Sequence, residues 1–571
     1  MKSRKKQSVE QGVPGYGPQV AAMHTPPHAA NLFRCGRGPI QNPDVGTQKM
    51  KNRMTRQSAY LWVAIVVFAC VAGYLTMRST SLYGPGLSPD STEYVALARD
   101  VSANGFAFLT ENKAVVQPPL YPIALAATSS LTGSTVIHAA RGINILSSAA
   151  LVAVILLTVS RVTMSIPVLI VTGILSCFSI PLTGVWSMAW TEPLFILTVS
   201  LALLIVGEHK HPVYSPLFAG VLTAAAFFTR YAGIVLLPVV TAFVFLSQTG
   251  GAWKRCKSAA LYALPPAIMF ALYLFRNFAL SGTLLGARSP SQLGISDNID
   301  RVKDVILAWF LPWRIHSFAT FLLLMCTFIG ALTWHHRHHI AHVIRNSERI
   351  VLLCAAFSVT YTAFIVWTST TTAYDHINDR LLSPLYPSLL ILLAALLKPE
   401  SWRNQLVRNL ALGVFCLLCV VAPLRTTYSQ VNRKAAQGAG GYNSRNWQES
   451  ELVGYFRQNG QPKEIVFSNS PDALYILADV TAKMSPAKLN YNSNKGTGVT
   501  NENMFTEYPS LDGAILVWFK PNWRNYLFTL DDLDTMCDLE EIATFSDGSI
   551  WRIRSSNKSV EHYVSPGADA G

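Results

Sequence analysis

The stretch that decides the fold is residues 59–77, AYLWVAIVVFACVAGYLTM. It contains no charged residue, and a helix of about 20 apolar residues is long enough to cross the hydrocarbon core of a bilayer, which is about 30 Å thick. Its apolar residues do not alternate with polar ones, as they would in a strand of a membrane barrel. Because backbone polar groups in lipid must be satisfied within the segment, the stretch predicts a membrane-spanning helix.

Similar apolar runs recur as far as residue 424, and the composition of the 571 residues agrees, with 50% hydrophobic and 14% charged residues. We therefore predict an α-helical polytopic membrane protein with about 11 transmembrane helices. The predicted spans are Ala59–Met77, Ile137–Val159, Ile166–Trp186, one from Pro193, a pair around FFTRYAG at 227–233, Ala259–Phe275, Phe318–Trp334, Ile350–Trp367, one that ends before KPESW at 398–402, and Leu410–Val421.

Lys and Arg gather in alternate loops, which predicts the orientation, because short cytoplasmic loops are rich in these residues. Residues 1–56 form a basic tail that we expect to be disordered and cytoplasmic. Met50 and Met54 precede the first span, which leaves open whether residues 1–49 are translated. The protein is expected in the inner (plasma) membrane, with residues 57–424 as its transmembrane catalytic domain and 425–571 as a small extracytoplasmic domain.

The segment 425–571 has the pattern of an α/β domain. EIVFSN at 464–469 and GAILVWFK at 513–520 have strand composition, and NWQESELVGYFRQNG at 446–460 has helical spacing that ends at a glycine. EIATFSDGSIWRIR at 541–554 predicts a hairpin around an Asp-Gly turn.

Polar residues cluster at the predicted outer ends of the spans, where a charge is costly enough to suggest a function. Each also has a plainer explanation. The acids at 90 and 192 suit helix caps or first turns, and the arginines suit contacts with lipid head groups. Isolated histidines make a metal site a weak alternative. The residues in question are Asp90, Glu93, Tyr94, Arg141, Glu192, Arg230, Arg276, His376 and Arg380.

The order of several short motifs resembles the GT-C superfamily of polytopic glycosyltransferases, in particular the bacterial branch similar to protein O-mannosyltransferases and lipid A aminoarabinose transferases. The motifs run from about residue 59 to 400. They are PDSTEY at 89–94, QPPLYPIAL at 117–125, RGINILSS at 141–148, TEPLF at 191–195, TRYAG at 229–233, RN at 276–277, and His376 and Arg380 followed by Pro384 and Pro387.

This resemblance implies transfer of a sugar from a polyprenyl-phosphate carrier to an acceptor hydroxyl outside the cytoplasm. Asp90 would act as the catalytic base, and Glu192 as a second catalytic carboxylate. Arg380, Arg230 and Arg276 would bind the carrier phosphate. Glu93, Tyr94, Arg141 and His376 would complete the substrate site. The expected partners are the lipid-linked donor, membrane lipids and a glycan, lipid or protein acceptor. No cofactor is certain, and a divalent metal ion is left open because the sequence lacks a ligand cluster.

Two other functions share some of these features. A transporter also has many spans, but it would place its charges near the bilayer midplane and in repeated halves. A lipid-linked oligosaccharide ligase or polymerase would use the same carrier and move a whole glycan. The net charge of +14 does not indicate nucleic acid, because much of it lies in the tail and in loops that face anionic lipid.

Overall fold

The structure is a computed structural model of the chain. By its contacts, the chain divides into residues 1–55 and residues 56–571, and each is considered by itself. The structure describes residues 43–110, 115–208, 213–286, 288–310, 348–373, 375–398, 419–490 and 495–555, with a few single positions between them.

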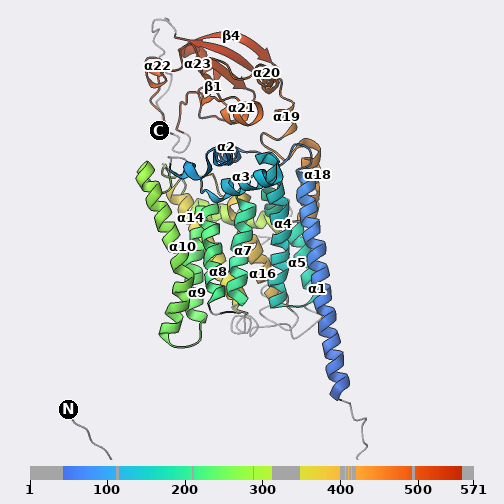
Figure 1. The fold of residues 1–571 in the computed structure, drawn as a ribbon. Helices are drawn as coiled ribbons and strands as arrows, with labels where there is room; N and C mark the ends of the chain where they lie inside the picture. The colour runs from blue at the N-terminus through green and yellow to red at the C-terminus, as the bar shows by residue number, and fades with distance from the viewer. Residues whose placement is uncertain are drawn as a thin grey trace, which may run out of the picture. The chain divides into compact units, whose positions relative to one another are not determined.

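Long apolar helices form most of the second unit (Figure 1). Four described helical segments are long and apolar enough to cross a membrane: Ser58–Ser79, Val136–Val162, Ala252–Ser281 and Arg349–Thr371. A fifth candidate is a broken pair with a 45° bend, Ile166–Cys177 with Ile180–Trp186. The chain is therefore a multi-pass membrane protein. The two predicted spans Phe318–Trp334 and Leu410–Val421 lie wholly or mostly outside the described residues, and the number eleven stays a prediction.

The described helices of the membrane part include both long spans and shorter helices between them. They are α1 (Pro43–Ser79), α2 (Pro89–Asn104), η1 (Gly105–Thr110), α3 (Leu120–Thr132), α4 (Val136–Val162), α5 (Ile166–Cys177), α6 (Ile180–Trp186), α7 (Glu192–Glu208), α8 (Tyr214–Thr229), η2 (Tyr231–Val235), α9 (Leu236–Ser247), α10 (Ala252–Ser281), α11 (Ile295–Phe310), α14 (Arg349–Thr371), α15 (Asp379–Leu382), α16 (Leu385–Leu397) and α18 (Val421–Gln437).

Two local features differ from the sequence prediction. Helix α1 begins at Pro43, before the predicted span and within the tail 1–56 that was expected to be disordered. Positions 43–56 are rich in Lys, Met, Arg and Gln, which are strong helix formers. The predicted span 166–186 is broken between α5 and α6, because Ser179 caps a new helix through the backbone N–H of Leu182.

The C-terminal part contains the predicted small sheet. Its elements are α19 (Arg445–Gln448), α20 (Glu451–Asn459), β1 (Val466–Ser468), α21 (Pro471–Ala478), β2 (Lys483–Met484), α22 (Met504–Glu507), β3 (Ile515–Phe519), α23 (Leu530–Met536), β4 (Asp538–Phe545) and β5 (Gly548–Arg554). The strand order is β2-β1-β3-β5-β4. The first three strands are parallel, and the predicted hairpin β4–β5 pairs with β3 in antiparallel register.

Helices α2 and α3 lie across one end of the long helices, between them and the sheet (Figure 1). We call this end of the bundle the site end. Helix α2 packs against α21 through a shared apolar cluster that includes Val95, Ala98, Ala473 and Ile476. The C-terminal part thus contacts the helix that carries Asp90.

A second connection joins the loop before α2 to the segment after α18. Leu87 and Gly441 form an isolated parallel bridge, and the amide of Tyr442 donates to the carbonyl of Leu87 at 2.9 Å. Gly441 has φ +56°, and a Cβ at this position would lie 1.8 Å from the carbonyl oxygen of Leu87. Only glycine fits this close approach.

Candidate active site

Ser88 caps α2 and thereby sets the position of Asp90. The Ser88 hydroxyl accepts from the amide of Ser91, and the Ser91 hydroxyl accepts from the amide of Ser88, which forms a reciprocal capping box. Pro89 occupies the first turn. The alternative that Asp90 caps its helix is therefore wrong. Asp90 is free of that task, and its side chain is 39% exposed.

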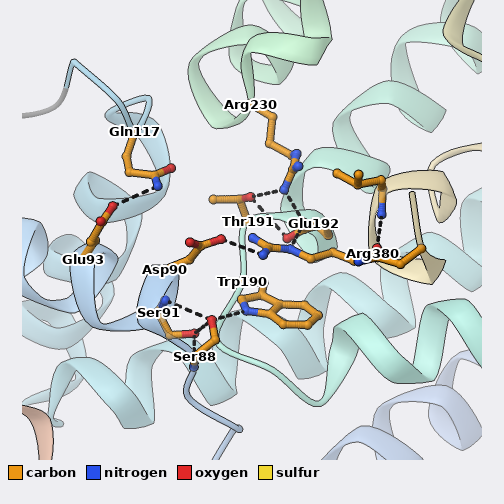
Figure 2. A network of polar contacts seen from close by, with 12 residues as sticks. Ser88, Asp90, Ser91, Glu93, Gln117, Trp190, Thr191, Glu192, Arg230 and Arg380 are labelled. Carbon is orange, nitrogen blue, oxygen red and sulfur yellow. Dashed lines mark hydrogen bonds and ion pairs between the residues drawn. The ribbon is translucent and has the colours of Figure 1, made fainter. Parts of the chain in front are cut away.

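A chain of alternating charges runs from Asp90 into the bundle (Figure 2). Asp90 Oδ2 pairs with Arg380 Nη1 at 2.6 Å, and Arg380 Nε donates to Glu192 Oε1 at 2.6 Å. Arg230 Nη1 pairs with the same oxygen of Glu192. The four residues come from α2, α7, α15 and the turn between α8 and η2, so the tertiary fold brings together four segments that are distant in sequence.

Glu192 is the buried centre of this network. Its side chain is 0% exposed, whereas those of Arg380 and Arg230 are 13% and 19% exposed. Its other oxygen, Oε2, accepts from the Thr191 hydroxyl at 3.3 Å. A buried carboxylate needs such partners, because an unpaired charge in the interior is strongly destabilising. Glu192 therefore holds two guanidiniums in place and does not face solvent.

Trp190 supports Arg380 from one side. The centre of the Arg380 guanidinium lies 4.3 Å from the centroid of the Trp190 ring. The indole N–H donates to Ser88 Oγ at 2.8 Å (Figure 2). The capping residue of α2 and the support of Arg380 are thus directly linked. Sequence reasoning did not assign Trp190, and its only signal was an aromatic residue two positions before the acid.

The short helix α15 is held by its own contacts. Asn378 caps it through the amide of Leu381 at 3.2 Å. Tyr361 donates to the carbonyl of Leu381 at 3.1 Å, and Trp309 Nε1 donates to Asp379 Oδ1 at 2.7 Å. These bonds to α14 and α11 fix the direction in which Arg380 leaves the backbone.

Glu93 and Tyr94 lie on α2 beside Asp90. Glu93 Oε2 accepts from Gln117 Nε2 at 2.9 Å, which ties α2 to the segment before α3 (Figure 2). Tyr94 is buried and packs edge-on against Tyr121, with ring centroids 5.4 Å apart. Burial, with a smaller effect from the charge of Asp90, raises the pKa of Tyr94, so its hydroxyl stays protonated.

Three predicted site residues lie outside this network. Arg141 binds the end of α1, donating to Thr80 Oγ1 and to the carbonyl of Met77, both at 3.1 Å. Arg276 donates to the carbonyl of Leu109 at 2.7 Å and so fastens η1 to α10. His376 is exposed, four positions before Arg380, and has no hydrogen bond or ion pair with the described residues of the network.

In the part of the chain that the structure describes, no group of three His, Cys, Asp or Glu side chains is placed to hold a metal ion. The roles assigned to the residues of the network therefore do not include metal binding.

Known structures define the class of fold to which the chain belongs. No protein-family model and no curated protein matches the chain. Solved structures do match over most of its length, and they are GT-C glycosyltransferases. The chain has the fold of these membrane enzymes.

Two proteins illustrate the similarity. ArnT from Cupriavidus metallidurans, a lipid A aminoarabinose transferase, superposes with a TM-score of 0.54 and 14% identity over 87% of this chain and 98% of its own. ArnT bound to undecaprenyl phosphate superposes with a TM-score of 0.55. An oligosaccharyltransferase from Archaeoglobus fulgidus matches with a TM-score of 0.51 and 12% identity over 79% of this chain and 68% of its own. The resemblance inferred from the motifs is thus confirmed at the level of the fold.

Proposed function

We propose that the chain transfers a sugar from a polyprenyl-phosphate carrier to an acceptor hydroxyl at the site end of the bundle, on the extracytoplasmic side of the membrane. The observation that carries the proposal is the ion pair between the partly exposed Asp90 and Arg380, backed by the buried Glu192. A structure of the same fold binds undecaprenyl phosphate, which supports a lipid-phosphate donor.

In this reaction the acceptor oxygen forms a bond to the anomeric carbon of the sugar, and the bond from that carbon to the carrier phosphate breaks. The acceptor proton goes to Asp90, whose carboxylate is the exposed end of the network. The electron pair of the broken bond leaves with the carrier phosphate. Arg380 and Arg230 are placed to stabilise the charge that develops there.

The burial of Glu192 favours a different role from the one that the sequence suggested. It has no exposed surface, and both of its oxygens accept hydrogen bonds from neighbouring side chains. We assign it as a positioning residue that keeps two arginines close together despite their like charge. Arg380 contacts both carboxylates, so arrival of a phosphate would loosen its bond to Asp90 and free that carboxylate for the acceptor.

The test is sugar transfer by the full chain reconstituted in lipid, from a panel of polyprenyl-phosphate sugars and lipid-linked oligosaccharides. Asp90→Asn retains the shape of the side chain but cannot take a proton, and α2 keeps its Ser88 cap. We expect transfer from one donor class, lowered by about 10²- to 10⁴-fold in Asp90→Asn. Transfer by the variant at the wild-type rate would remove Asp90 from the chemistry, and no transfer from any donor would refute the proposed function. Use of an intact oligosaccharide would identify the ligase alternative.

A further inference from the structure

Lys434 lies near the end of α18, outside the charge network described above. Arg78 Nε and Nη2 donate to Asn432 Oδ1 at 3.3 and 3.2 Å, which places this part of α18 beside the last turn of α1. The candidate span in α1 ends at Ser79. Lys434 is therefore close to the level at which a membrane span ends, where lipid head groups lie.

Among the described residues, the amine of Lys434 has one hydrogen-bond partner. Nζ donates to Ser187 Oγ at 2.5 Å, and that hydroxyl gives its own proton to the carbonyl of Gly184 at 2.8 Å. Two N–H groups of the amine are left. Among the described residues, no carboxylate pairs with this amine. Trp186, the neighbour of Ser187, also has a buried indole N–H without a hydrogen-bond partner.

The electrostatics of Lys434 indicate the same lack of a counter-ion. Burial, with a smaller effect from the adjacent Arg433, lowers its pKa to about 8, whereas a nearby carboxylate would act in the opposite direction. The residue as a whole is only partly buried, so a ligand can approach it from solvent or lipid. A cation in such a place is costly unless an anion accompanies it.

From this geometry we infer that Lys434 and Ser187, with Arg433 beside them, form a second anion site that binds a phosphate group, separate from the proposed catalytic network. A phosphate oxygen can accept the two remaining N–H groups of the amine. The level of the site relative to α1 favours the phosphate of an anionic lipid head group as the natural ligand. Free inorganic phosphate offers the same chemistry from solution.

The site adjoins the two loops that carry the network. The carbonyl of Ser187 accepts from the amide of Gly86 at 2.8 Å, and the amide of Ala189 donates to the carbonyl of Gly86 at 2.9 Å. These loops continue directly to Ser88 and Trp190, which are joined by their own hydrogen bond. An anion held by Lys434 would therefore order the loops that position Asp90 and Arg380.

The test measures binding without relying on activity. The full chain is reconstituted in nanodiscs of zwitterionic phosphatidylcholine with an increasing fraction of phosphatidylglycerol, and its thermal unfolding midpoint is followed. In the wild type we expect the midpoint to rise and saturate. Lys434→Met should need about tenfold more anionic lipid for the same rise, because a charge-assisted hydrogen bond is lost.

Matched variants make the result specific. Arg425→Met removes one exposed cation from the same helix and should respond like the wild type. Lys434→Arg should keep most of the response. If Lys434→Met cannot be purified, Ser187→Ala replaces it, and we expect a weakened response. The inference would be overturned if Lys434→Met, or Ser187→Ala in its place, responded to the anionic lipid as strongly as the wild type.

A second arm separates the two sources of phosphate. Inorganic phosphate is titrated into nanodiscs of phosphatidylcholine alone. A rise that depends on Lys434 would assign the site to free phosphate, and a rise with phosphatidylglycerol only would assign it to a lipid head group. No Lys434-dependent response in either arm refutes the site. These readouts do not require sugar transfer, so they stand apart from the proposed function.

Discussion

Arg380 Nη1 and Asp90 Oδ2 lie 2.6 Å apart, although one residue is in α15 and the other in α2. The same guanidinium binds the buried Glu192 through Nε. A single arginine thus connects a partly exposed carboxylate to a fully buried one. The candidate site thus contains a partly exposed acid, cations beside it and a buried counter-charge.

Replacing Glu192 by Gln should destabilise the protein by about 3–5 kcal/mol, because Arg230 and Arg380 then lose their buried counter-charge. The measurement is unfolding by denaturant of the protein in nanodiscs. Asp90→Asn is the control, and it should cost less than about 1 kcal/mol because Asp90 is partly exposed. Equal stability of the two variants would contradict the assignment of Glu192 as the positioning residue.

Replacing Arg380 by Lys should lower kcat by about 100-fold. An ammonium cannot bond both carboxylates and stack on Trp190 at the same time. Steady-state kinetics with the donor identified above measure the effect. Arg276→Lys is a matched control, because Arg276 contacts Leu109 and lies outside the network, and it should change kcat much less. A larger loss in the control would place the phosphate site at Arg276 instead.

Replacing Trp190 by Phe keeps a ring under Arg380 and removes only the N–H that binds Ser88. We expect a loss of about 0.5–1.5 kcal/mol in the free energy of unfolding, as for a typical hydrogen bond. Trp190→Leu also removes the ring and should lower transfer further. If the Trp190→Phe and Trp190→Leu variants transfer sugar at the same rate, the ring does not support Arg380.

Replacing Gly441 by Ala should destabilise the protein and lower transfer, because the new Cβ would collide with the carbonyl of Leu87. Gly460→Ala is the control. Its φ is also positive, at +72°, but no atom lies within 4 Å of the new Cβ. It should show only the backbone cost of about 1–2 kcal/mol. Similar unfolding midpoints for the two variants would mean that the loop before α2 tolerates separation from the C-terminal part.

The pH dependence of stability should report the buried amine of Lys434. Its pKa of about 8 lies below the value of 10.5 for a free lysine, so between these values the folded state binds fewer protons than the unfolded state. In phosphatidylcholine nanodiscs without added inorganic phosphate, the free energy of unfolding of the wild type relative to Lys434→Met should therefore rise as the pH increases from 8 to 10. A difference that does not change with pH would show that the amine is solvated.

Much of this protein could be predicted from periodicity and composition. The apolar runs predicted the long helices because a membrane requires length and apolar character, which are local properties of the sequence. Strands β1 and β3 and the hairpin β4–β5 could be predicted for the same reason, since their pattern lies within each segment, whereas the two-residue strand β2 was not predicted. The motifs also indicated the GT-C fold, because they can be recognised without knowledge of the contacts between segments.

Which polar residues meet was decided by the tertiary structure alone. Position at the end of a predicted span suggested Asp90, Glu192, Arg230 and Arg380 together with Arg141 and Arg276, and nothing in the sequence separated the two groups. Packing of α2, α7, α15 and the turn between α8 and η2 brings the first four into one network, whereas the other two fasten neighbouring segments. The sequence by itself determined the membrane class and the individual helices, because these depend on local hydrophobicity. The tertiary structure decided burial and charge pairing, because these depend on contacts between distant segments.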